Sequence, residues 1–396
     1  MNKSRRFRGA PRPRPSDLPP RWSVSLLSQP LLVLSTLLML VHWKGAPVAI
    51  SGISVSNFFI LIFLLPEIVS GRLTTQFPKV FLLPILPILS ILMLDIVDLN
   101  GGNLIWIFQS AMFLIFPYVV WRVGCVRKEI QLLFVFVLAS QFYLTTIHGL
   151  SFPENDLGGF FVQRRTIHSL MLGYVSLLMI PLLRRESSRI VLFGSIAILL
   201  VVSQARGAAL LFILSAFMFD SDVFRVRTKL AAALLSVVAA ILIIRLDPEI
   251  IAHYDALLSL SGGSSSGYRA YLFESLVTQV DRYWLSGMPN DDIQNLLAEK
   301  FTDGRRYYEF PLDNSIVLVA LRYGLLPLFL TLLLAARLLK SFKPTAVFFV
   351  GWLFLDDILG SGLGWFLLGL TIVVTKVEAS RSNSRLELLP VLRTPS

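Results

Sequence analysis

The chain has 396 residues, of which 55% are hydrophobic and only 15% are charged. A typical soluble domain has about one quarter of its residues charged, so the composition excludes an ordinary cytosolic, secreted or disordered protein and predicts an integral membrane protein. The net charge of +11 at pH 7 needs no nucleic-acid partner, because Lys and Arg collect in the cytoplasmic loops of such proteins. Cys125 is the single cysteine, which excludes an internal disulfide, and no metal-ligand pattern of Cys and His is present.

The predicted fold class is an all-α integral membrane protein with about twelve transmembrane helices, each needing about 20 apolar residues. Residues 1–25 form a basic, proline-rich tail, residues 26–246 hold the first nine helices, residues 313–375 hold the last three, and a second tail covers residues 376–396. The predicted spans are Leu26–His42, Val48–Leu65, Phe77–Leu94, Leu104–Trp121, Glu129–Ile147, Thr166–Leu183, Arg189–Ser203, Ala205–Phe219, Lys229–Leu246, Asp313–Ala336, Pro344–Leu359 and Gly362–Thr375.

The distribution of basic residues predicts the orientation. Most Lys and Arg fall in the two tails and in the alternate short loops on the side of the N-terminus, so both termini are expected in the cytoplasm. The one long loop, residues 247–312, then lies on the periplasmic side. Its amphipathic stretches predict short helices at Glu249–Leu260, Tyr268–Tyr283 and Asp291–Phe301.

Arginines on the predicted outer side run against this charge rule and are the first candidates for a binding site. Arg206 lies in a loop of a few residues, followed by the small residues Gly207-Ala208-Ala209. Arg269 falls in the first turn of a predicted helix, where free N–H groups already favour an anion, and Arg164 and Arg165 open the sixth predicted span. A guanidinium binds phosphate oxygens bidentately, which predicts a phosphate site; contact with lipid headgroups or solvent is the alternative.

Asp313 and Asn314 begin the tenth predicted span on the same side. The Asp313 carboxylate could accept a proton from an attacking hydroxyl, or it could only cap the helix. Arg322 is expected about 13 Å further along that helix, at a depth where an arginine marks a candidate functional site. We expect it to form a buried ion pair with Asp356 or Asp357, in either a functional or a purely structural role.

Three segments of the chain, taken in order, resemble the bacterial O-antigen polymerase and O-antigen ligase superfamily. They are Ser203-Gln204-Ala205-Arg206-Gly207, then Gly267-Tyr268-Arg269 with the turn that follows it, and then Asp313-Asn314-Ser315-Ile316 followed by Tyr323-Gly324-Leu325-Leu326. Gly158-Gly159-Phe160-Phe161 before the sixth predicted span adds a further likeness. The resemblance covers Gly158 to about Leu334.

This resemblance implies a glycosyltransferase of the bacterial inner membrane that uses a polyprenyl-pyrophosphate-linked glycan donor, a lipid-linked acceptor, and neither metal nor cofactor. Arg206 and Arg269 would hold the donor pyrophosphate, and Asp313 would orient or deprotonate the acceptor hydroxyl. The remaining substrate-binding candidates are Arg164, Arg165, Tyr268, Asn314 and Arg322. A chain-length regulator protein is a further expected partner.

Two alternatives stay open beside the polymerase. Ligases of the superfamily commonly carry His where this chain has Asp313, which favours a polymerase of repeat units over a ligase that delivers glycan to lipid A core. A transporter of lipid-linked glycans or a small-solute permease would also have many spans, but the two halves of the chain show no internal repeat, whereas many transporters do.

Overall fold

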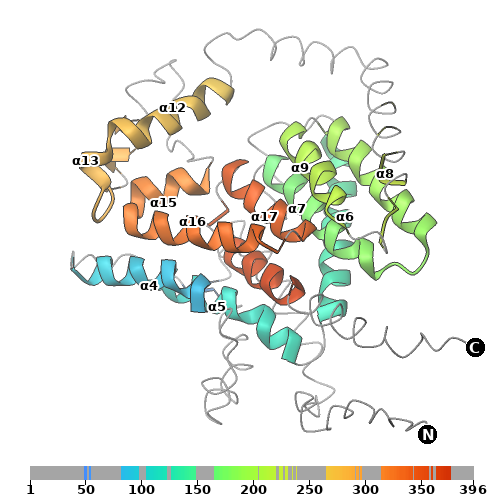
Figure 1. Ribbon diagram of the computed structural model, residues 1–396, viewed down its shortest axis with the longest axis horizontal. Helices are drawn as coiled ribbons and strands as arrows, with labels where there is room; N and C mark the ends of the chain where they lie inside the picture. Colours follow the sequence, from blue (N-terminus) through green and yellow to red (C-terminus); the bar gives the residue numbers. More distant parts are fainter. Residues whose placement is uncertain are drawn as a thin grey trace, which may run out of the picture.

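The structure, a computed structural model, is an assembly of α-helices (Figure 1). It describes residues 49–50, 53–54, 82–97, 104–122, 126–148, 165–203, 205–219, 223–225, 228–230, 234, 238, 265–289, 291–293, 295–296, 314–341, 343–355, 358–359 and 363–375.

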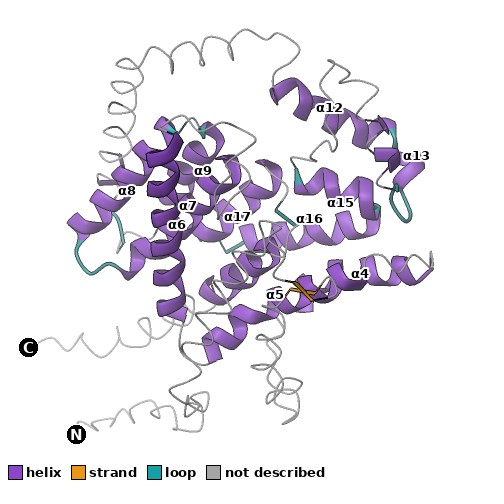
Figure 2. Cartoon of the chain, turned by 180° about the vertical axis from the view of Figure 1, so that it is seen from behind, coloured by secondary structure: helices purple, strands orange, loops and turns teal. Residues whose placement is uncertain are grey.

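The helices agree in position with most of the predicted apolar segments. In chain order they are α4 (Leu82–Val97), α5 (Leu104–Arg122), α6 (Val126–His148), α7 (Arg165–Met179), η4 (Ile180–Leu182), α8 (Glu186–Val202), α9 (Arg206–Phe217), α12 (Ser265–Thr278), α13 (Val280–Tyr283), α15 (Ser315–Tyr323), α16 (Leu325–Leu339) and α17 (Pro344–Leu355). Residues 363–375 form a further helical segment. Helices dominate the view from behind as well (Figure 2).

Two predicted spans differ from the structure in kind. The second, Val48–Leu65, contains the short strands β1 (Ala49–Ile50) and β2 (Ile53–Ser54), which pair antiparallel. The tenth, Asp313–Ala336, is divided into α15 and α16 by Gly324, whose φ of 90° ends the first helix. The predicted spans Leu26–His42 and, for the most part, Lys229–Leu246 lie outside the described residues.

The predicted membrane architecture needs a correction. Within the part of the chain that the structure describes, no helix combines enough length with a long enough apolar run to cross a membrane. The fold class of about twelve transmembrane helices is therefore wrong, and so is the multi-pass inner-membrane localisation that followed from it. Division of the apolar sequence into short helices is one physical reason, since α9 and α17 have 12 residues each and α15 has 9, whereas a span needs about 20.

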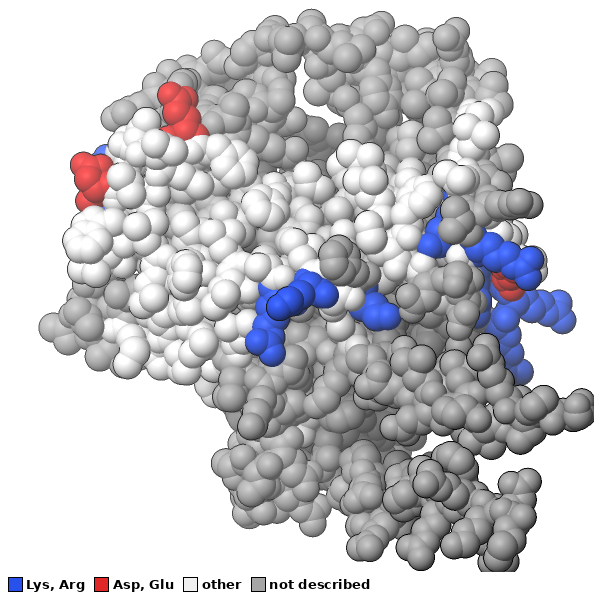
Figure 3. Space-filling model, in the orientation of Figure 1, with Lys and Arg blue, Asp and Glu red and all other residues white. Residues whose placement is uncertain are grey.

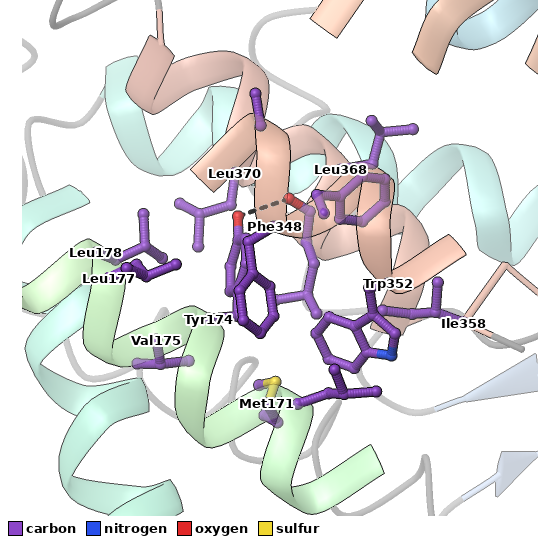
Figure 4. Packing of buried hydrophobic residues seen from close by; sticks show 14 of the residues in the cluster. Met171, Tyr174, Val175, Leu177, Leu178, Phe348, Trp352, Ile358, Leu368 and Leu370 are labelled. Carbon is purple, nitrogen blue, oxygen red and sulfur yellow. Dashed lines mark hydrogen bonds between the residues drawn. The ribbon is translucent and has the colours of Figure 1, made fainter. Parts of the chain in front are cut away.

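Most of the described helices share one large apolar cluster, here called the main core, with Tyr174 near its centre. The Tyr174 ring lies 6.2 Å from Phe348 and 6.3 Å from Trp352, centroid to centroid (Figure 4). Its hydroxyl donates to the Leu367 carbonyl at 3.0 Å and shares a 2.6 Å hydrogen bond with Thr371. Burial raises the pKa of Tyr174, so the hydroxyl stays neutral and ties α7 to residues 363–375.

A second, smaller cluster joins α12 and α13 to α15. It consists of the buried side chains Leu272, Tyr283, Met288, Ile293, Val317, Leu318, Ala320 and Leu321, and is called the loop cluster below. Leu272 of α12 and Val317 of α15 have no exposed surface. The same short helix α15 also contributes Ile316, Val319 and Tyr323 to the main core, so α15 separates the two clusters and contacts both.

On the face drawn in Figure 3, most of the acidic side chains lie at the upper left, and most of the basic ones lie in the lower middle and at the right, where one acidic side chain lies among them. Part of the basic group lies where α16 ends and α17 begins, at Arg337, Lys340 and Lys343. Lys229 is different, because its ammonium group donates to the carbonyls of Phe217 and Phe219 and so caps the negative end of the α9 dipole.

Candidate functional site

Arg206 is the first residue of α9. The connection from α8 is short, because Ser203 ends α8 and the Ala205 amide still bonds to the Leu200 carbonyl at 3.1 Å. Gly207 then allows α9 to approach α17 closely: a Cβ on this glycine would lie 3.3 Å from the Leu355 side chain. The start of α9 is thereby packed against the last residue of α17.

Asn314 caps the start of α15. Its side-chain oxygen accepts hydrogen bonds from the Ile316 and Val317 amides at 2.9 and 3.1 Å, and its side-chain nitrogen donates to the Phe354 carbonyl at 2.9 Å. The next residue strengthens the attachment, because the Ser315 hydroxyl accepts from the amides of Ile358 and Leu359 at 2.8 and 3.1 Å. Asn314 and Ser315, called the Asn–Ser clamp below, fix the start of α15 to the end of α17.

The end of α17 is therefore a junction of two helix starts. Leu355 contacts the start of α9, and the neighbouring Phe354 carbonyl bonds to the start of α15. The start of α9 has no side-chain cap, so its first N–H groups are open to a ligand, whereas at the start of α15 the Ile316 and Val317 amides are already bonded to Asn314. Both starts carry the positive end of a helix dipole. The uncapped start of α9, with the positive end of the α15 dipole beside it, makes this junction a candidate place for an anion.

The start of α7 lies at the same end of the helix group. Short connections join α7 to α8 and α8 to α9, so α7 and α9 run in the same direction. Gly207 packs on Leu355 and Gly351 packs on Leu211, which makes α9 antiparallel to α17. Arg165, the first residue of α7, consequently begins its helix on the side where α17 ends.

Helix α12 approaches the junction from the other side of α15. The turn after α13 contacts the end of α15, since the Met288 amide bonds to the Leu321 carbonyl at 2.6 Å. Helix α12 lies over α15 (Figure 1) and must run back from that turn. Its N-terminal half, with Tyr268 in the first turn and Arg269 directly after it, is therefore directed toward the start of α15, where Asn314 lies.

Other predicted site residues are placed differently or lie outside the description. Arg322 is exposed, at the opposite end of α15, and its guanidinium lies 5.8 Å from the centre of the Tyr323 ring. The expected burial of Arg322 is wrong, because its side chain is exposed near the end of α15, where Gly324 ends the helix. The proposed base Asp313 lies outside the described residues, as do Arg164 and the expected Arg322 partners Asp356 and Asp357.

His168 is a buried titratable group near the start of α7. Its side chain is 1% exposed, and neither ring nitrogen has a hydrogen-bond partner in the described structure. Burial lowers the pKa of His168 to about 4, so the imidazole is neutral at pH 7. Among the described residues, no group of three or more His, Cys, Asp or Glu side chains is arranged to hold a metal ion.

Sequence reasoning missed the role of Ser315 and the structural role of Asn314. Asn314 was expected to bind substrate, yet its amide group is taken up by one carbonyl and two amides of the protein. A polar pair at the start of an apolar helix was the available signal, since such residues commonly cap helices. Nothing in the sequence indicated that the partners would be residues 354–359.

The starts of α9 and α15 at the end of α17, with the first turns of α7 and α12 directed toward them, form the candidate site. The arginines that the sequence singled out begin or closely follow the start of three of these helices. No known protein family's model matches the chain, and no curated protein is detectably similar to it.

Proposed function

We propose that the chain is a glycosyltransferase that polymerises polyprenyl-pyrophosphate-linked oligosaccharide repeat units into a polysaccharide. The observation that supports this most is the junction at the end of α17. There the helix that begins with Arg206 and the helix capped by Asn314, the residue after Asp313, are attached to neighbouring residues.

The pyrophosphate leaving group of this reaction is stabilised mainly by positive charge. When the glycosidic bond to the donor breaks, negative charge builds up on the pyrophosphate oxygens. Arg206 and Arg269 at the starts of their helices provide guanidinium groups, and the N–H groups of the same helix starts add to the positive potential. Stabilising charge that develops during the reaction is the main way in which such fixed donors accelerate a step.

The acceptor hydroxyl supplies the nucleophile. Its oxygen forms a bond to the anomeric carbon of the donor while the bond from that carbon to the pyrophosphate oxygen breaks, and the polyprenyl pyrophosphate leaves with the electron pair. The hydroxyl proton passes to the Asp313 carboxylate and from there to solvent. Arg164, Arg165 and Tyr268 are the remaining candidates for contacts with the donor.

The test is a profile of lipid-linked glycans, resolved by mass, in a strain that lacks the gene and carries single variants of it. Arg206→Lys and Arg269→Lys keep the charge but remove the bidentate fork, and we expect single repeat units to accumulate on the carrier while long chains are lost. Asp313→Asn should give the same profile. Arg337→Lys, at the exposed end of α16, is the matched control and should behave like the unaltered protein.

Two other outcomes of this experiment would replace the proposal. Long chains that remain on the carrier without reaching lipid A would indicate a ligase. Lipid-linked glycans that are unchanged in amount and length in the strain without the gene would exclude glycosyl transfer to these acceptors.

A further inference from the structure

Two glycines from distant parts of the sequence meet where α13 and α15 end. Gly287 and Gly324 have φ values of 84° and 90°, in the region that side-chain-bearing residues rarely adopt. A Cβ on Gly287 would overlap the Arg322 carbonyl, and a Cβ on Gly324 would overlap the Leu285 carbonyl. Each glycine thus makes room for the backbone of the other segment, and we call the pair the glycine interlock.

Backbone hydrogen bonds hold the two segments in this position. The Met288 amide donates to the Leu321 carbonyl at 2.6 Å, and the Leu325 amide donates to the Trp284 carbonyl at 3.1 Å. The two bonds run in opposite directions between the segments, so sliding of one segment along the other would break both. The interlock therefore fixes the turn after α13 to the end of α15 with little freedom.

Helix α15 is consequently attached at both ends. The Asn–Ser clamp fixes its start to the end of α17, beside the start of α9. The interlock fixes its end to the segment that carries α12. Tyr283 joins α13 back to α12 by donating its hydroxyl hydrogen to the Leu276 carbonyl, and Leu272 of α12 is fully buried against α15. The nine-residue helix α15 therefore fixes the position of the α12 backbone relative to that of α9.

We infer that the glycine interlock is a positioning element for Arg269: it sets the place of this arginine relative to Arg206, so that both arginines act on one pyrophosphate. This inference rests on the proposed glycosyl transfer. The glycines do not touch substrate, and their effect on the reaction passes through α12. Loss of the interlock lowers kcat by misplacing Arg269, while Arg206, attached through α17, keeps its place.

The experiment is a pair of double-mutant cycles on the purified full-length chain. The donor is the polyprenyl-pyrophosphate-linked repeat unit extracted from the strain without the gene, and kcat and KM are measured from release of polyprenyl pyrophosphate. One cycle combines Gly287→Ala with Arg269→Lys, and the other combines Gly287→Ala with Arg206→Lys. We expect each single change to lower kcat about tenfold or more, as loss of one transition-state donor does.

The two cycles should differ. In the Gly287→Ala variant the interlock is lost and Arg269 no longer contributes to the reaction. Adding Arg269→Lys to this variant should therefore lower kcat by less than about threefold. Arg206→Lys should still cost its full factor, because independent sites multiply their effects on the rate. A general loss of stability would not distinguish the two arginines, and Phe193→Leu in the main core, where Phe193 stacks on Phe212, is the control that lowers stability without touching the interlock.

Further variants keep the test decisive if Gly287→Ala does not fold. Tyr283→Phe removes only the hydroxyl that ties α13 to α12, and it should lower kcat several-fold with the same dependence on Arg269. Val277→Ala, at an exposed position of α12, should leave the rate unchanged.

The inference fails if both cycles are multiplicative, or if both arginine changes lose their effect equally, while each arginine variant alone lowers the rate. The proposed function itself fails if neither Arg206→Lys nor Arg269→Lys alters the release of polyprenyl pyrophosphate. The two failures give different results and can be told apart in the same set of measurements.

Discussion

The main core and the loop cluster are held together in different ways. In the main core, large side chains such as Tyr174, Phe348 and Trp352 fill the space between helices. In the loop cluster, fewer apolar side chains are buried, and the closest approach is made by the backbones at Gly287 and Gly324. Glycines allow close approach in the main core as well, since a Cβ on Gly369 would overlap the Leu114 carbonyl. The loop cluster differs because its two glycines have positive φ and each makes room for the segment of the other.

Removal of a central aromatic ring should have the largest effect and should be confined to the main core. For Trp352→Ala we expect a loss of about 3–5 kcal/mol in the free energy of unfolding, because a fully buried ring leaves a cavity. Trp352→Phe is the sharper control. It keeps one aromatic ring in the core and removes the indole N–H, which is buried without a partner, so it should cost clearly less than Trp352→Ala. Thermal unfolding of both variants would measure this, and equal losses would contradict it.

The matching change in the loop cluster adds one methyl group instead of removing a ring. Gly324→Ala should destabilise the protein by roughly 2–4 kcal/mol, since the residue must hold a positive φ and its Cβ overlaps the Leu285 carbonyl. Hydrogen exchange read by mass spectrometry should show faster exchange in α12 and α13, with α7 and α17 protected as before. Loosening spread evenly over both regions would mean that they are one cooperative unit.

Acid should weaken the main core through His168. Its pKa is lowered by burial from 6.5 to about 4, so the folded state binds fewer protons than the unfolded state between these values. Stability is therefore full above about pH 6.5 and falls as the pH drops toward 4, by about 2 kcal/mol at pH 5. His168→Gln should remove most of this dependence when unfolding is followed from pH 7 to 5, and an unchanged slope would exclude His168 as its source.

The loop cluster should instead be sensitive to base. Burial raises the pKa of the Tyr283 hydroxyl, so the folded state keeps its proton longer than the unfolded state does, and stability falls as the pH rises beyond about 10. This smaller effect should appear as faster exchange in α12 and α13 at high pH. Tyr283→Phe should abolish it.

Hydropathy located most of the helices but did not determine how they are divided. The segment Leu104–Trp121 was predicted within one residue of α5, because an uninterrupted apolar run of this length predicts one continuous helix. The single span expected at Asp313–Ala336 is two helices, because hydropathy does not register the φ of Gly324. The same error led to the expectation that Arg322 is buried, whereas its side chain is exposed near the end of α15.

The candidate site was predictable in its residue types and less so in its connections. The charge rule singled out Arg165 and Arg206, and free N–H groups at a predicted helix start singled out Arg269; each lies within the first two turns of a helix. The end of α17 as the meeting point could not be predicted, since it depends on hydrogen bonds between Asn314, Ser315 and residues 354–359. Contacts between segments some 40 residues apart leave no periodic signal in the sequence.

The glycine interlock also has an evolutionary consequence. A side chain at either position collides with the carbonyl of the opposite segment, so a substitution at one position displaces the backbone that the other was selected to fit. Among descendants of a common ancestor, positions 287 and 324 should therefore be glycine together or change together. Such a coupled pair, 37 residues apart in the chain, would identify distant relatives of this protein even where the apolar helices around it have diverged beyond recognition.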